Sequence, residues 1–99
     1  MQLASSPVPL LTDPRTYMDP RIMQQEATAP STSVLYIRVD NHVITIQGAH
    51  GASVTVGDVL YQLYHACKDR YRSQDERRQP FLAGLIPTSR AGYFDARLQ

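Results

Sequence analysis

The stretch VTVGDVLYQLYHAC, residues 54–67, decides the fold because it holds the clearest helical pattern of the chain. Thr55 and Asp58 have the spacing of a capping box, in which each side chain accepts a hydrogen bond from the other residue's backbone amide. At about 100° per residue, one face of such a helix collects the apolar side chains. These are Val56, Val59, Leu60, Leu63, Tyr64, Cys67 and Tyr71. The stretch therefore predicts an amphipathic helix that packs on a sheet.

The segments on both sides of this helix predict strands. Apolar residues alternate with other side chains over residues 34–39 and 43–47, which is the period of half-buried strands. Asp40 and Asn41 lie between them and tolerate the left-handed backbone of a tight turn. FLAGLIP and YFDARLQ, after the helix, are typical of two further strands. The order predicts an α+β fold, with an antiparallel sheet of about four strands and one main helix on one face.

The first third of the chain predicts an arm rather than a part of this sheet. Five of the seven prolines stand before residue 33. Because proline lacks a backbone donor, this region cannot form an interior strand or one long helix. Asp19 and Pro20 have the chemistry of a helix start, so a short helix is expected over RIMQQEA. We predict a Pro/Ser-rich, partly disordered arm over residues 1–32 and a small α+β domain over residues 33–99.

Composition restricts the class of protein. A chain of 99 residues forms at most one domain with a thin margin of stability. Ten Lys and Arg against nine Asp and Glu do not indicate a nucleic-acid-binding polycation. One cysteine excludes an intrachain disulfide and a Cys-rich zinc site, and no window approaches about 18 consecutive apolar residues. We expect an intracellular protein, cytoplasmic or nuclear, without a membrane span, cofactor or metal.

The polar face of the predicted helix carries the candidate site. Tyr61 shares that face with His65, Lys68 and Arg72. An exposed aromatic side chain among cations can be a contact point between proteins, although a plain exposed tyrosine is the commoner explanation. We predict that these four residues, or alternatively an edge of the sheet, form an interaction surface for an unknown partner protein or for a second copy of the chain.

Two alternatives concern catalysis and nucleic acids. His65 and Asp69 stand four residues apart, which suits a histidine oriented by a carboxylate in a small hydrolase or transferase, although a solvated pair is the commoner explanation. Residues 68–78 hold half of the chain's cations and would carry any weak nucleic-acid binding, but acidic residues interrupt them. The chain shows no Gly-rich phosphate loop, nucleophile elbow or zinc signature. Cys67 lies on the apolar face, where a thiol is unreactive. We therefore expect a non-catalytic interaction or structural module.

Four segments in a fixed order carry a family resemblance. They are EATAPSTSVLYIRV, HVITIQG, VTVGDVLYQLYHAC and FLAGLIPTSRAGYFDARL. With these the chain resembles, over residues 26–99, a domain-of-unknown-function family of basidiomycete fungi. The matching residues are Ala27, Thr28, Pro30, Ile44, Ile46, Thr55, Val56, Asp58, Val59, Leu60, Phe81, Gly84 and Leu85. The resemblance implies an α+β fold and no known activity, catalytic residue or cofactor. A hairpin followed by a capped helix is also similar to a β-grasp domain, although DARLQ lacks the diglycine of a conjugated modifier.

Overall fold

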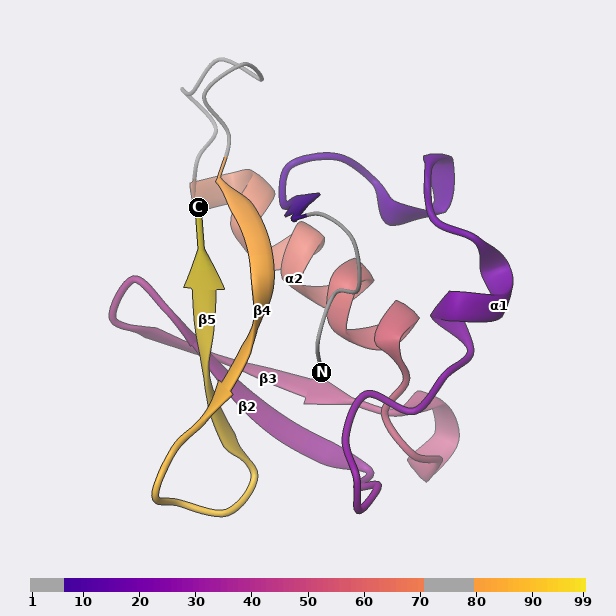
Figure 1. Ribbon diagram of the computed structural model, residues 1–99, viewed down its shortest axis with the longest axis vertical. Helices are drawn as coiled ribbons and strands as arrows, with labels where there is room; N and C mark the ends of the chain where they lie inside the picture. The colour runs from indigo at the N-terminus through magenta and orange to yellow at the C-terminus, as the bar shows by residue number, and fades with distance from the viewer. Residues whose placement is uncertain (1–6, 71–79) are drawn as a thin grey trace.

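The computed structural model describes residues 7–70 and 80–99 as one sheet with helices on one side (Figure 1). The strands are β1 (Val8–Pro9), β2 (Val34–Val39), β3 (His42–Gln47), β4 (Phe81–Pro87) and β5 (Tyr93–Leu98). The main helix is α2 (Val56–Arg70), and the shorter helical elements are η1 (Pro14–Thr16), α1 (Pro20–Met23) and η2 (Ala49–Gly51). The prediction of an α+β fold with one main helix is confirmed.

The sheet has five strands in the order β1-β4-β5-β2-β3, so the prediction of about four strands was wrong. The added strand comes from the arm, where Val8 pairs with Leu82 of β4. A two-residue strand shows no periodicity, and its proline is tolerated because an edge strand needs no donor on its free side. The sheet is also not wholly antiparallel, because β5 lies parallel to β2 and antiparallel to β4.

The β2–β3 hairpin forms as its turn residues predict. Val39 pairs with His42, and Asp40 and Asn41 between them have φ values of 48° and 69°. Both therefore occupy the left-handed region that suits a two-residue turn with the twist of the strands. This turn fixes the register that sends Leu35 and Ile46 to one side of the sheet.

Helix α2 begins at the predicted capping box. The Asp58 amide donates to Thr55 Oγ1 at 3.1 Å, and the Thr55 amide donates to Asp58 Oδ2 at 3.0 Å. The predicted apolar face is buried at Val56, Val59, Leu60, Leu63 and Cys67. Tyr64 is half-buried, and Tyr71 lies outside the described residues. The helix thus rests on the sheet through the residues that the periodicity selects.

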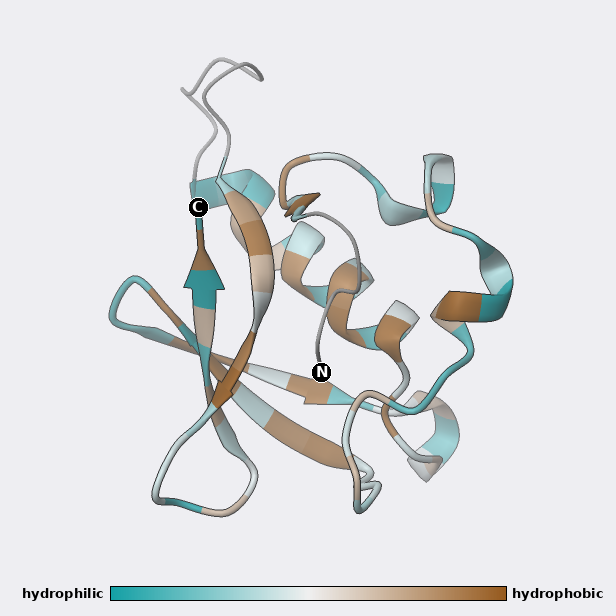
Figure 2. Ribbon diagram, viewed as in Figure 1, coloured by the Kyte–Doolittle hydropathy of each residue, from teal (hydrophilic) through white to brown (hydrophobic). Residues whose placement is uncertain are grey.

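The arm runs along the side of α2 that faces away from the sheet (Figure 1). Val8, Leu10 and Ala27 belong to the same hydrophobic core as the strands and α2. Figure 2 shows hydrophobic residues recurring along β4 and α2, whereas the β2–β3 turn is hydrophilic. The core therefore lies on one face of the sheet, where α2 and the arm close it.

Both Asp-Pro-Arg triplets of the arm start a helical turn. The Asp19 carboxylate accepts a hydrogen bond from the Arg21 amide, as its predicted capping role requires. The helix that follows ends at Met23, which is shorter than the predicted segment. Asp13 accepts from the Arg15 amide in the same way and caps η1. The two turns hold the arm against α2, because both α1 and η1 contact that helix.

Candidate functional site

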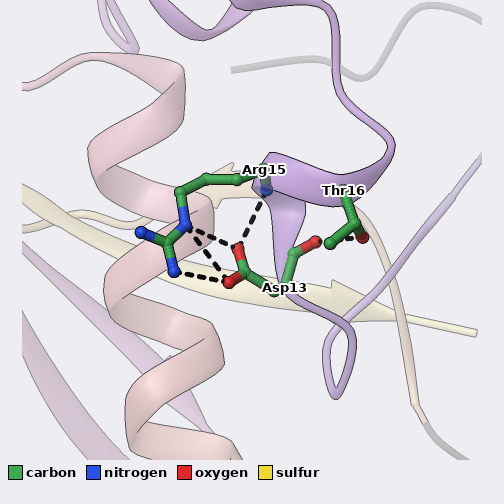
Figure 3. A network of polar contacts seen from close by, with 3 residues as sticks. All are labelled: Asp13, Arg15 and Thr16. Carbon is green, nitrogen blue, oxygen red and sulfur yellow. Dashed lines mark hydrogen bonds and ion pairs between the residues drawn. The ribbon is translucent and has the colours of Figure 1, made fainter.

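Tyr61, the centre of the predicted surface, is half-buried because the arm reaches over it. The Arg15 guanidinium lies 4.7 Å from the centre of the Tyr61 ring. Asp13 holds that guanidinium, with 2.7 Å between Arg15 Nη2 and Asp13 Oδ2 (Figure 3). The Arg15 hydrogen bonds keep the pKa of the Asp13 carboxyl below its usual value. The arm therefore supplies a positioned cation to the predicted surface.

A groove of about 520 Å³ opens between α1 and the first turns of α2 beside Tyr61. Its lining comes from both segments: Arg15, Pro20, Met23, Gln24, Thr55, Gly57, Asp58 and Tyr61. Gly57 sets the distance between the two helices, since a Cβ atom there would lie only 3.0 Å from the Met23 Cβ and carbonyl oxygen. A glycine at this position lets α1 approach and form the wall of the groove.

The structure brings three of the four predicted surface residues together along α2. The His65 ring meets Tyr61 edge-on, with 4.4 Å between ring centres. The centre of the His65 ring also lies 5.3 Å from the centre of the Tyr64 ring. Lys68 Nζ lies 5.4 Å from the centre of the Tyr64 ring. Arg72, the fourth residue, lies outside the described residues. The described surface is thus a series of rings and cations that continues from the groove.

Among the described residues, the catalytic alternative gains no cysteine nucleophile. His65 and Asp69 are both exposed on α2, as their spacing requires. Cys67 is fully buried, and its burial raises the pKa of the thiol. Because thiolates are the reactive form, a raised pKa makes this cysteine a poor nucleophile, and its burial makes it a core residue. Catalysis through His65 and Asp69 stays a prediction.

Three other expectations from the sequence concern the basic segment, metal ions and a membrane span. Of the basic segment 68–78, residues 71–79 lie outside the described residues. In residues 7–70 and 80–99, no group of three or more His, Cys, Asp or Glu side chains is placed to hold a metal ion. Over the same residues, no helix combines the length and the apolar character needed to cross a bilayer.

A second surface, on the face of the sheet that α2 leaves open, was missed by the sequence reasoning. One row crosses four strands in register and contains Ile86, Asp95, Arg38 and Val43. Arg38 Nε lies 2.9 Å from Asp95 Oδ1 at the middle of the row. The two ends are apolar and exposed, 55% for Val43 and 48% for Ile86. The signal that could have revealed this surface is the set of residues that alternate with the buried ones in each strand, because all of them point to one common face.

The neighbouring row of this face holds stacked rings. Tyr36 and Tyr93 lie 4.6 Å apart between ring centres, at an interplanar angle of 18°. The Arg90 guanidinium lies 4.2 Å from the centre of Tyr93. A hollow of about 360 Å³ adjoins these groups and is lined by Arg38, Val43, Thr88, Arg90, Tyr93, Phe94 and Asp95. The open face therefore combines cations, aromatic rings and exposed apolar side chains.

Comparison with known proteins identifies the family. The model of a family of unknown function, DUF6699, matches residues 1–93. The chain belongs to this family. No curated protein and no solved structure matches the chain. The DUF6699 match confirms the resemblance to a family of unknown function. It begins at residue 1 rather than residue 26 and ends at residue 93, so the arm that builds the groove lies within the matched region.

Proposed function

We propose that this DUF6699 chain is a small non-catalytic interaction domain that binds a partner protein in the groove between α1 and α2. The observation that carries the proposal is the groove itself, which two separate segments build around the predicted contact residue Tyr61. Pro20 and Met23 add apolar wall, and Arg15 and Asp58 add charge at the border. Aromatic side chains in such settings supply much of the binding energy at protein interfaces. The occupant we propose is a large apolar side chain on an exposed segment of the partner.

The polar groups of the groove support binding rather than acid–base chemistry. Thr55 and Asp58 donate and accept the hydrogen bonds that cap α2. Arg15 is held by Asp13 and lies over the Tyr61 ring. A general base must reach the proton that it removes, and these groups are instead occupied in structural contacts. The groove offers shape, apolar area and fixed charge to a partner.

The compartment that we propose is the cytoplasm or the nucleus. Cys67 is a free, buried thiol, and burial raises its pKa. Such a cysteine needs no oxidising environment. Fractionation of the native source with an antibody against the chain would test this, and recovery in a secreted fraction would contradict it.

Site-directed photo-crosslinking in native extract tests the groove. A benzophenone side chain at Gln24, which lines the groove, should form a protein adduct of defined mass. The matched control is the same group at Gln25, which is also exposed but is not among the lining residues. Tyr61→Ala should remove the Gln24 adduct. An adduct of equal yield from both positions, or one that survives Tyr61→Ala, would contradict the proposal.

A further inference from the structure

The open face of the sheet has an unbalanced charge. Among its described residues it carries the cations Arg38, Arg90 and Arg97 and one carboxylate, Asp95. Asp95 is already paired with Arg38. A surface with surplus positive charge attracts partners of the opposite sign and suppresses cationic ones. The charge pattern therefore selects an acidic partner for this face.

Arg90 is the positioned cation of the face. Its guanidinium lies over the Tyr93 ring, 4.2 Å from the ring centre, and Tyr36 stacks on the same tyrosine. Within residues 7–70 and 80–99 it forms no ion pair with an acidic side chain. A guanidinium carries its N–H donors in a planar fork that receives a carboxylate with two hydrogen bonds. Arg90 is thus prepared for an anion that the described residues do not supply.

The hollow beside Arg90 indicates which side chain of the ligand would lie next to that carboxylate. Its volume of about 360 Å³ suits one or two side chains rather than a folded element. Val43, which is 55% exposed, lines the same hollow together with the Arg38–Asp95 pair. A ligand residue next to the carboxylate can therefore bury an apolar side chain against Val43.

We propose that the open face of the sheet binds an acidic, extended peptide segment of a partner protein, with a carboxylate on Arg90 and a neighbouring apolar side chain on Val43. A single-stranded nucleic acid would need free ring faces on which its bases could stack. The Tyr93 ring is already in contact with Tyr36 and with Arg90, which favours the peptide. This surface lies across the sheet from α2, so the proposal does not depend on the groove.

Titration of the full chain with three synthetic peptides tests the proposal. The peptides are blocked decamers that share Val and Ser positions and carry Glu, Gln or Lys at the remaining positions. In ¹H–¹⁵N spectra the Glu peptide should shift the Arg90 Nε–H signal and the backbone amides of Val43 and Tyr93. Arg90→Ala should weaken its binding about ten- to a hundredfold, the usual effect of losing a charge-assisted hydrogen-bonded pair. Arg90→Lys should also weaken it, because lysine keeps the charge but lacks the planar fork.

The matched control is Arg21→Ala, which removes the same charge from an arginine on α1 that pairs with Asp19. It should leave the affinity for the Glu peptide unchanged. Equal weakening by Arg21→Ala and Arg90→Ala would overturn the proposal, because it would show attraction by net charge alone. Equal binding of the Glu and Gln peptides, no binding of the Glu peptide at millimolar concentration, or tighter binding of oligouridylate at Arg90 would overturn it as well.

Discussion

The two faces of the sheet use alternate residues of the same strands for different purposes. Toward α2 the strands present Leu35, Ile37 and Ile46, which are all 0% exposed. On the opposite face, Val43 and Ile86 remain about half exposed. A side chain's contribution to stability depends on the area that folding removes from water, so similar aliphatic residues on the two faces differ in effect. The comparison indicates that one face holds the fold together and the other is available for recognition.

The largest effect should separate the two faces directly. Ile37→Ala removes a fully buried side chain and should lower the free energy of unfolding by about 2–5 kcal/mol. Val43→Ala, on the open face of the neighbouring strand, should change it by about 0.5 kcal/mol or less. Urea denaturation followed by circular dichroism measures both. Equal losses from the two substitutions would contradict the division between the faces.

A smaller effect should come from the helix that covers the inner face. Thr55→Ala removes the oxygen that accepts from the Asp58 amide and should cost about 0.5–2 kcal/mol. Thr55→Ser keeps that oxygen and should stay close to the parent chain. The same urea titration checks both variants. If serine and alanine were equally destabilising, the methyl group of Thr55 and not the capping bond would stabilise α2.

The elements that the sequence predicted correctly are those with local signals. The α2 helix follows from the Thr55 and Asp58 spacing, and the β2–β3 turn follows from Asp40 and Asn41. Strand β1 has no such signal, because Val8–Pro9 is a strand only through its pairing with β4. The place of β5 between β4 and β2 likewise depends on packing. The alternation of YFDARL predicts a strand but not its neighbours in the sheet.

The candidate sites show the same limit. Periodicity placed Tyr61 on the polar side of α2, where it is found beside His65. It could not show that Arg15, 46 positions earlier by residue number, would lie over that ring. The segment that contains Arg90 has ordinary turn chemistry, and the stacking of Tyr36 on Tyr93 beside it exists only because β5 lies next to β2. Sites formed by contacts between distant segments were therefore beyond the sequence pattern.

The ion pair at the centre of the open face should contribute little to stability. Arg38 and Asp95 have side-chain exposures of 59% and 35%, and surface pairs of this kind are worth about 0.2–1 kcal/mol. A double-mutant cycle with Arg38→Ala and Asp95→Ala measures their coupling. The coupling should shrink between 0.05 and 0.5 M salt, roughly, because exposed charges are screened. A coupling energy as large as the unfolding free energy lost in Ile37→Ala would mean that the open face also holds the fold together.

The effect that is smallest at neutral pH belongs to Cys67, on the face of α2 that meets the core. Burial raises the pKa of this thiol in the folded chain, whereas the unfolded chain titrates near the ordinary value of about 8.5. Above that pH the unfolded state loses a proton that the folded state retains, so stability is unaffected at pH 7 and falls as the pH rises toward the folded pKa. Urea midpoints at intervals from pH 7 to 10 measure the slope, and Cys67→Ala isolates it from the titration of tyrosine and lysine. The parent chain should lose more stability than Cys67→Ala over this range. If stability fell equally with pH in the parent chain and in Cys67→Ala, water would reach the thiol. The packing of α2 against the inner face of the sheet would then be looser than the burial of Cys67 indicates.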